Sequence, residues 1–523
     1  MKIISKSKDE IVLLSLHDEG ISKGDYLIIE EINDIDSKDG YNNNNSSNNN
    51  SSNSISSNSS NKMLLVQVYD EEYHNTQSLL DDIVRDEILN ATSKCNHYDP
   101  LGIGSIARIL RDAKLIKCKI RASIENDNIG NDVSWLPSRV NSRIRKISVC
   151  ELNSILKRRG AYPIKIGYSY NGNEEVTIYA EDLDGRLNLI TGKKGSGKSH
   201  LTKCIVKGLV EYGAYTIVLD LNNEYLGLAW NGHGSKSSIA DKVLFLEPGK
   251  GLRFTLEYIG KGAMANMLKY ALDMPASSLR EFFRVWDNLE SRNRLNISSL
   301  FDAIVNLKTN ELVKEALISR LHAIITSNLF ADASNTSSNN NYCIKLEDII
   351  RQKSTGMAMI IGMGRVSSLV RRMTVELLLT KLIELLEQGK IPPIFLFAEE
   401  AHLYLRDTYW EDIVTRMRHF GIFTTFITNQ PDAINDSIYR QLDNIFLFNF
   451  TNESDLEKIA RVSLIDTDSI KSIVRTLQAR HCMVIGNVVS NLPLVIKTRE
   501  EEVLMLGDTR RFFKSNSRER KAR

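Results

Sequence analysis

The segment Gly192-Lys193-Lys194-Gly195-Ser196-Gly197-Lys198-Ser199 decides the fold. It is a complete GxxxxGK[ST] pattern between the apolar run 187–190 and a stretch of helical spacing over 201–212. A strand that runs through a glycine-rich loop into a helix is the context in which this pattern binds phosphate. The segment therefore predicts a P-loop nucleotide-binding core.

The residue types of this loop suit ATP and Mg²⁺. Glycines let backbone N–H groups turn toward a phosphate, and the following helix start adds partial positive charge. Lys198 is expected to contact the β- and γ-phosphates, and the Ser199 hydroxyl to ligate Mg²⁺. The predicted nucleotide-binding residues form one run: Gly192, Lys193, Lys194, Gly195, Ser196, Gly197, Lys198, Ser199 and His200.

A second apolar run ends in acidic residues. Residues 394–397 have the length and composition of a buried strand, and Ala398-Glu399-Glu400-Ala401-His402 follows. Because successive strand residues face opposite sides, the two glutamates are expected to differ in role. We expect Glu399 to hold Mg²⁺ and Glu400 to orient the attacking water as a base. Two surface acids at a helix start are the alternative, and His402 fits either a phosphate-sensing or a structural role.

Two polar segments lie further along the chain. Thr428-Asn429-Gln430-Pro431 follows the apolar run 422–427, where a side chain could sense the γ-phosphate; a simple turn is the alternative. The segment 416–421 contains two arginines. In a ring, an arginine at the edge of one subunit can reach the ATP of the next, whereas a surface salt bridge is the alternative.

The order of strand-like and helix-like stretches indicates several domains. From about residue 185 they alternate, which is typical of a parallel sheet with helices on both faces. Residues 262–345 show helical spacing and then a polar tract, which predicts an all-helical insertion. Short apolar stretches at 11–14 and 26–29 predict a small N-terminal β-rich module. The Asn/Ser tract 42–62 is expected to be a disordered insertion within a hairpin, because the strand pattern resumes at 63–68.

Composition narrows the classes of function. With 523 residues, 42% hydrophobic and 25% charged, the chain has the profile of a soluble globular protein of more than one domain. No apolar run is long enough to cross a bilayer and no signal-peptide layout begins the chain, so we expect a cytoplasmic protein without a membrane partner. Six cysteines without zinc-site spacing predict reduced thiols. Basic runs at 139–159 and 510–523 fit either DNA-phosphate or partner contacts, or solvated surface.

The motifs resemble, in order and spacing, the HerA branch of the HerA/FtsK ATPases. The resemblance rests on the P-loop, the Glu399–His402 box, the segments 418–421 and 428–431, and Asn452-Glu453-Ser454-Asp455-Leu456. Asp220-Leu221-Asn222-Asn223-Glu224-Tyr225 is similar to that branch's D-x-x-G-E-Y segment. Asn223 stands where that segment usually has Gly, and Asn429 where the turn usually has Gln.

We expect an α/β fold in which the resemblance implies a RecA-like P-loop ATPase core and an N-terminal small β-barrel domain, and in which the helical spacing predicts the all-helical insertion. The strand and helix pattern divides the chain into the barrel-like domain 1–170, the ATPase domain 171–500 and a basic tail 501–523. The resemblance further implies a homo-hexameric ring that moves along double-stranded DNA without sequence preference, and a NurA-like nuclease partner in DNA end resection and double-strand break repair. Lys198 and Glu400 would then be catalytic, with Arg418 as a trans arginine finger.

Three alternatives differ from this expectation. A DNA-pumping ATPase of the same superfamily, serving conjugation or genome packaging, would share the core. A two-lobed helicase would also end a strand in Glu-Ala-His, but about 125 residues after Ala398 are too few for a second lobe. A scaffold that binds nucleotide without hydrolysing it is the third, and the intact set of Lys198, Ser199 and Glu400 argues against it.

Overall fold

The computed structural model describes residues 1–15, 19–31, 62–73, 113–125, 128–130, 132–170, 174–331, 343–403, 409–463, 465–499, 503, 504 and 506. Nearly all of the Asn/Ser tract, the polar tract 334–341 and nearly all of the basic tail lie outside these residues. The predictions for those segments therefore stay predictions.

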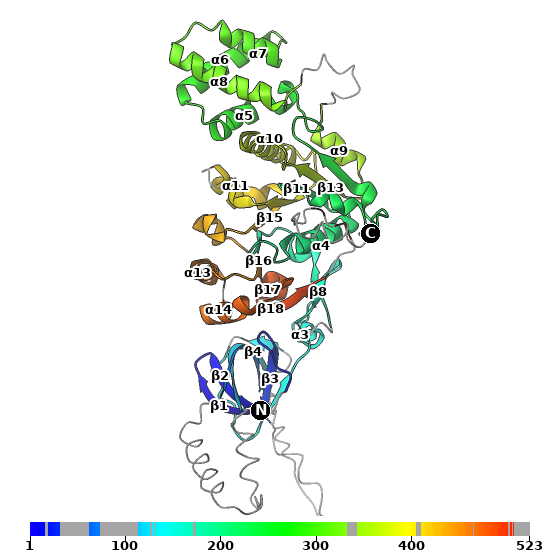
Figure 1. Ribbon diagram of the computed structural model, residues 1–523, viewed down its shortest axis with the longest axis vertical. Coiled ribbons are helices and arrows are strands. Elements are labelled where there is room, and N and C mark those ends of the chain that lie inside the picture. Colours follow the sequence, from blue (N-terminus) through cyan, green and yellow to red (C-terminus); the bar gives the residue numbers. More distant parts are fainter. Residues whose placement is uncertain are drawn as a thin grey trace, which may run out of the picture.

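The N-terminal strands form a seven-stranded antiparallel sheet (Figure 1). The order along it is β1 (Lys2–Ser7), β2 (Glu10–Ser15), β5 (Lys114–Glu125), β4 (Lys62–Tyr73), β3 (Tyr26–Glu31) and β7 (Ser142–Lys146), with β6 (Asn128–Gly130) paired to β5. Strands β1 and β7 also touch, so the sheet curls into a small barrel around alternating apolar side chains such as Ile11, Leu13 and Leu27. Tyr26 pairs with Gln67 and Glu30 with Met63, which confirms that β3 and β4 form a hairpin around the Asn/Ser tract. We call residues 1–146 the N-terminal module.

The second sheet has eleven strands and carries the P-loop. Its order is β12 (Val243–Leu246), β13 (Met357–Gly362), β11 (Tyr215–Asp220), β14 (Ile394–Glu399), β15 (Ile422–Thr428), β10 (Asn188–Thr191), β16 (Asn444–Phe448), β17 (His481–Gly486), β18 (Leu494–Thr498), β8 (Pro163–Ser169) and β9 (Glu175–Tyr179). The run from β12 to β16 is parallel, as predicted. The remaining strands pair antiparallel, so the sheet continues beyond its predicted parallel part as a mixed sheet.

Helices cover both faces of this sheet, which confirms the predicted α/β class. Adjacent strand residues such as Ile217 and Val218 belong to different cores, because a strand turns successive side chains to opposite faces. On one face α4 (Lys198–Glu211) buries Leu201 and Ile205. On the other, α10 (Ser368–Glu387) and α11 (Tyr409–Phe420) bury Met373 and Met417.

The predicted helical insertion lies at the end of the molecule opposite the N-terminal module (Figure 1). It contains α5 (Leu256–Asn266), α6 (Ala276–Ser291), α7 (Ile297–Val305) and α8 (Glu311–Ser327), and α9 (Leu346–Gln352) follows. The helices begin earlier than the predicted 262, and α7 was not predicted. Because α5 packs on α10, α10 is buried on most of its sides and shows little amphipathic pattern. Among the described helices, none combines the length and the apolar character that a membrane crossing requires.

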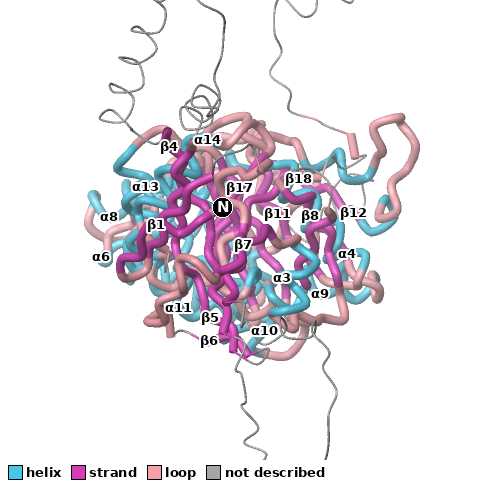
Figure 2. The backbone as a smooth tube through the Cα atoms, turned by 90° about the horizontal axis from the view of Figure 1, so that it is seen from below, coloured by secondary structure: helices cyan, strands magenta, loops and turns pink. Residues whose placement is uncertain are grey.

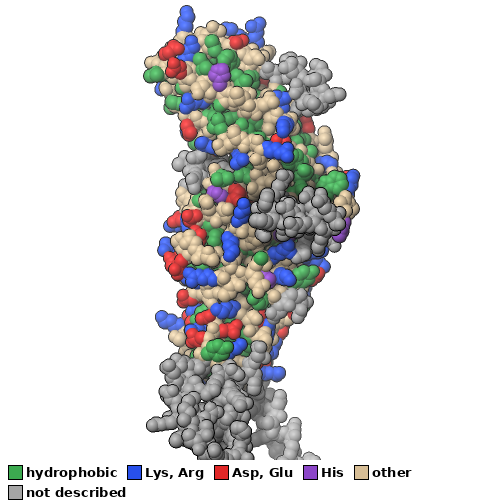
Figure 3. Space-filling view, in the orientation of Figure 1, with side chains coloured by type: hydrophobic (Ala, Val, Ile, Leu, Met, Phe, Trp, Pro, Cys, Tyr) green, Lys and Arg blue, Asp and Glu red, His purple; other side chains and the backbone are tan. Residues whose placement is uncertain are grey.

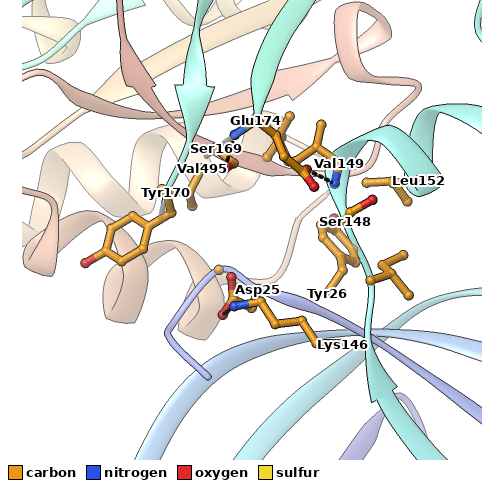
Figure 4. A pocket seen from close by; sticks show the side chains of 13 residues that line it. Asp25, Tyr26, Lys146, Ser148, Val149, Leu152, Ser169, Tyr170, Glu174 and Val495 are labelled. Carbon is orange, nitrogen blue, oxygen red and sulfur yellow. Dashed lines mark hydrogen bonds and ion pairs between the residues drawn. The ribbon is translucent and has the colours of Figure 1, made fainter. Parts of the chain in front are cut away.

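The N-terminal module and the larger sheet meet at β18 and α3 (Val149–Ile155). The Tyr26 hydroxyl and the Gln67 amide both donate to the carbonyl oxygen of Pro493, each at 2.8 Å. A cavity of about 320 Å³ lies at this junction. Figure 4 shows Lys146 and Asp25 side by side among its lining residues, and the two form an ion pair. Strand β8 lies before the predicted boundary at residue 170, yet it belongs to the larger sheet. The chain therefore passes from one sheet to the other between residues 146 and 163.

Charges of both signs are interspersed on the face of the molecule in Figure 3. The chain carries 67 basic and 65 acidic residues, so this mixture follows from composition. Part of the basic run 139–159 is engaged within the chain: Arg145 pairs with Glu151, Lys146 with Asp25 and Arg158 with Asp182. For these three residues the structure favours an intramolecular role over a DNA contact.

Candidate nucleotide-binding site

The P-loop connects the end of β10 to the start of α4, as the motif predicts. Gly195 and Gly197 have φ of 77° and 121°, a region that favours glycine. A Cβ at Gly192 would lie 2.4 Å from the Cβ of Phe448, so only glycine fits beside β16. The first turn of α4 therefore begins directly at the glycine-rich loop, which is the geometry of a phosphate site.

Lys198 folds back over this loop. Its ammonium donates to the carbonyl oxygens of Gly192 at 2.7 Å and Lys193 at 3.1 Å. Burial lowers the pKa of Lys198, while the nearby charges of Glu400 and Glu399 act in the opposite direction. The Ser196 hydroxyl is buried and makes no hydrogen bond within the described part of the chain. A lysine held among carbonyls and an unpartnered hydroxyl suit a phosphate anion, which would supply acceptors to both.

Glu399 is the last residue of β14 and is almost fully buried. Its carboxylate accepts hydrogen bonds from the backbone N–H of Leu221 at 3.0 Å and from the side chain of Asn222 at 3.2 Å. Burial, and then the charges of Asp220 and Glu224, raise its pKa to about 8. A buried carboxyl among other acids is the environment that a divalent cation would stabilise.

The segment 220–225 brings further acids to this place. Asp220 accepts hydrogen bonds from the N–H groups of Asn222 at 3.2 Å, Glu224 at 3.1 Å and Tyr225 at 2.9 Å. Glu224 accepts a hydrogen bond from the Ser199 hydroxyl. Burial raises the pKa of Glu224, while Ser199 and the charge of Lys203 oppose that rise. Sequence analysis identified Glu224 as part of the segment that resembles D-x-x-G-E-Y, but it did not predict a role for this residue.

The structure explains why Asn replaces Gly at position 223. Asn223 has a φ of 56°, in the left-handed region that asparagine enters more readily than most residues. Its side chain lies against Gly362 and Gly364, where added Cβ atoms would lie 3.2 Å and 2.5 Å from its amide. The departure from the family pattern therefore preserves the turn.

Glu400 leaves the strand in a different direction from Glu399. Its φ of 48° is unusual for a residue with a side chain, and such strain concentrates at functional sites. Its Oε2 lies 3.4 Å from Nδ1 of the buried His402, which is also 3.0 Å from the Thr428 hydroxyl. The structure therefore joins Glu400, His402 and the end of β15 in one polar cluster, and the charge of Glu400 acts on Lys198.

The other predicted site residues make fewer contacts with the rest of the site. Asn429 follows β15, which pairs with β10, and its Oδ1 is buried without a hydrogen bond among the described residues. His200 lies in the first turn of α4, and Lys193 and Lys194 are exposed. Arg418 is exposed in the last turn of α11 and forms no ion pair within the described residues. The structure thus gathers the P-loop with Glu399 and Glu400, and leaves Arg418 at the surface.

The acidic side of the site has a chemistry that suits a Mg²⁺ ion. Glu399, Glu224 and the Ser199 hydroxyl supply oxygen atoms, the ligand type that Mg²⁺ prefers. Among the described residues, no group of three or more His, Cys, Asp or Glu side chains is placed to hold a metal ion.

Comparisons with known proteins find HerA helicases among the relatives in sequence. A family model described as the central domain of helicase HerA matches residues 164–382. The HerA double-strand break repair helicase of Saccharolobus solfataricus is 22% identical over 413 residues, which cover 75% of this chain and 78% of that protein. Its counterpart from Sulfurisphaera tokodaii is 19% identical over 450 residues, which cover 82% and 84%. Among solved structures, VirB4 of Thermoanaerobacter pseudethanolicus is 12% identical with a TM-score of 0.49, over 65% of this chain and 97% of that one.

The matched region 164–382 runs from β8 through the P-loop and the acidic turn 220–225 to α10. The two relatives extend the match to most of the chain. With the P-loop and its acidic partners in place on an α/β sheet, the chain is similar to HerA proteins over most of its length.

Proposed function

We propose that this protein is an ATP hydrolase that moves along double-stranded DNA. The observation that carries the proposal is the convergence of two chain segments: Lys198 and Ser199 at the start of α4, and Glu399 and Glu400 at the end of β14. The choice of DNA as the substrate is supported by the names of the relatives, which are helicases of DNA double-strand break repair. Binding should be independent of sequence and should weaken steeply with salt.

Each residue has a distinct task in the proposed hydrolysis. The loop amides and Lys198 would bind the β- and γ-phosphates, and Lys198 would exchange its two carbonyl partners for phosphate oxygens. Ser199, with Glu399 and Glu224 nearby, would hold Mg²⁺, which neutralises charge that develops on the phosphates. Glu400 would accept a proton from the attacking water, and His402, whose ring also contacts the Thr428 hydroxyl, would orient the Glu400 carboxylate.

We further propose that the protein acts as a homo-hexameric ring with a NurA-like nuclease in end resection. In a ring, the exposed Arg418 of one subunit could reach the ATP of the next subunit and stabilise charge on the transferred phosphate. A single chain offers Arg418 no such role. The N-terminal module, a separate barrel at one end of the molecule, is a suitable surface for a nuclease. The ring and the nuclease partner are both implied by the family resemblance.

Steady-state ATP hydrolysis by the wild type and by Glu400→Gln, with and without linear duplex DNA, tests the proposal. We expect DNA to stimulate the wild type, and the variant to lose about a hundredfold or more in kcat while it still binds ATP. Glu257→Gln, an exposed glutamate in the first turn of α5, is the matched control and should retain wild-type activity.

Light scattering on the same material would measure particle mass. Equal hydrolysis by Glu400→Gln and the wild type would refute the role of Glu400. Activity of a monomer that does not respond to DNA would refute the translocase and leave a P-loop ATPase.

A further inference from the structure

The N-terminal module holds the first turn of α14 (Thr467–Thr476). From β5, the Arg121 guanidinium donates to Oδ2 of Asp466 at 2.9 Å and to the Ser469 hydroxyl at 3.0 Å. Asp466 is the N-cap of α14, and its other oxygen accepts the Ser469 N–H at 2.8 Å. Arg121 is only 10% exposed, and Gln67 accepts its Nε–H at 3.0 Å. This ion pair is therefore oriented on both sides and shielded from water.

A second contact lies one turn further along α14. Lys23 donates to Oδ1 of Asp70 at 2.7 Å and to the Ser472 hydroxyl at 3.1 Å. Asp70 belongs to β4, which packs against α14. In Figure 2, the view from below, α14 appears beside β4. Two turns of α14 are thus tied to the N-terminal module.

The opposite end of α14 is tied to the P-loop. The side-chain amide of the buried Asn449 donates to the carbonyl oxygens of Arg475 at 3.2 Å and Leu477 at 2.7 Å. The backbone oxygen of Asn449 accepts the N–H of Lys193, inside the P-loop, at 3.1 Å. One residue therefore bonds both to the last turn of the helix and to the loop.

The segment after α14 holds the P-loop a second time. The Arg480 N–H donates to the carbonyl oxygen of Ser196 at 2.8 Å. A Cβ atom on Gly197 would lie only 3.2 Å from the Cα of Arg480, so the two backbones are in close contact. Thr498 of β18 donates to the Arg480 oxygen through its N–H at 2.7 Å and its hydroxyl at 3.0 Å. Two P-loop positions, Lys193 and Ser196, are thus held from the α14 side.

We propose that α14 lets the N-terminal module position the P-loop, with Arg121 and Asn449 as the positioning residues at its two ends. A helix of ten residues is stiff, so a change in how its first turn is held is transmitted to its last turn. Among the described residues, Arg121 forms no hydrogen bond or ion pair with the P-loop, and Asn449 bonds to it through its backbone oxygen, which an Asn449→Ala substitution keeps. A partner that grips the module would thereby alter nucleotide affinity. This inference rests on the proposed ATPase activity only for its kinetic consequence, because the positioning of the loop exists without nucleotide.

Hydrogen exchange on nucleotide-free protein tests the positioning directly. In Arg121→Ala and Asn449→Ala, peptides that contain Lys193 and Ser196 should exchange faster than in the wild type. The KM for ATP should rise about three- to tenfold in both, with kcat within about twofold. Arg121→Lys, which keeps a charged bond to Asp466, should restore part of the protection. The double variant should show less than the product of the two single effects, because both act through α14.

Arg158→Ala is the matched control. Arg158 is 9% exposed and pairs with Asp182 at 2.6 Å, and the described residues give it no bond to α14 or to the P-loop. It should lower the unfolding temperature as Arg121→Ala does and leave P-loop exchange unchanged. Wild-type exchange in the P-loop of Arg121→Ala, or equal acceleration in Arg158→Ala, would overturn the inference. Faster exchange in a protein that hydrolyses no ATP would refute the proposed function alone.

Discussion

Replacement of Asp220 by alanine should destabilise the acidic turn of the site by a calculable amount. The carboxylate accepts three backbone N–H groups, from Asn222, Glu224 and Tyr225. Each buried donor left unpaired costs about 1–3 kcal/mol, and water can reach the first two because Asn222 is exposed and Glu224 is only partly buried. Loss of the repulsion that raises the pKa of Glu399 offsets part of this cost. We expect a net loss of about 2–4 kcal/mol.

The measurement is thermal unfolding of nucleotide-free protein followed by calorimetry. With an unfolding entropy of about 2.1 cal/mol/K per residue over about 330 residues, the expected loss lowers Tm by about 3–6 °C. Asp220→Asn keeps one acceptor oxygen and should fall between alanine and the wild type. Asn223→Gly is the control, because glycine accepts the φ of 56° and no bond to Asp220 is removed; its Tm should stay within about 1 °C. A wild-type Tm for Asp220→Ala, or an equal fall in the control, would show that these bonds do not hold the turn.

Two further predictions concern the P-loop and α14. Gly197→Ala should weaken nucleotide binding about tenfold or more in a fluorescent-nucleotide titration, because its φ is 121° and the added Cβ meets Phe448 at 3.1 Å; unchanged affinity would contradict this. Burial opposes ionisation of Asp466, but the charge of Arg121 and hydrogen bonds from Ser469 prevail and hold the pKa of Asp466 below its ordinary value. The ionised form therefore stabilises the fold above a pH of about 4, and this contribution disappears as the pH falls through the lower folded pKa. The Tm difference between the wild type and Asp466→Asn should be constant from about pH 8 to 5 and shrink below about pH 4; a constant difference at lower pH would contradict the ion pair.

The features that the sequence predicted well are encoded locally. The P-loop is one contiguous motif, and buried parallel strands appear as short apolar runs such as 394–397 and 422–427. The hairpin around the Asn/Ser tract could also be predicted, since the strand pattern stops and resumes on either side of it. Each of these signals depends on neighbours in sequence.

The features that the sequence did not predict depend on distant contacts. Strand β18 pairs with β8, more than three hundred residues earlier, and no local pattern reports such a pairing. The partner of Ser199 is Glu224, which only the folded sheet brings beside α4. The positive φ of Glu400 follows from the turn into the residues after β14, where an acidic pair alone gives no conformational signal. The roles of Arg418 and Asn429 stay predictions.

The pairing of β8 with β18 decides where the chain can be cut. A fragment that begins at residue 171 would keep β9 without its partner β8 and would expose the edge of β18. It would also uncover the face of α4 at Gly208, which packs against Ile164. Bare strand edges template aggregation, so such a fragment would be prone to precipitate. Work on the isolated ATPase region should therefore retain Pro163 and the residues that follow it.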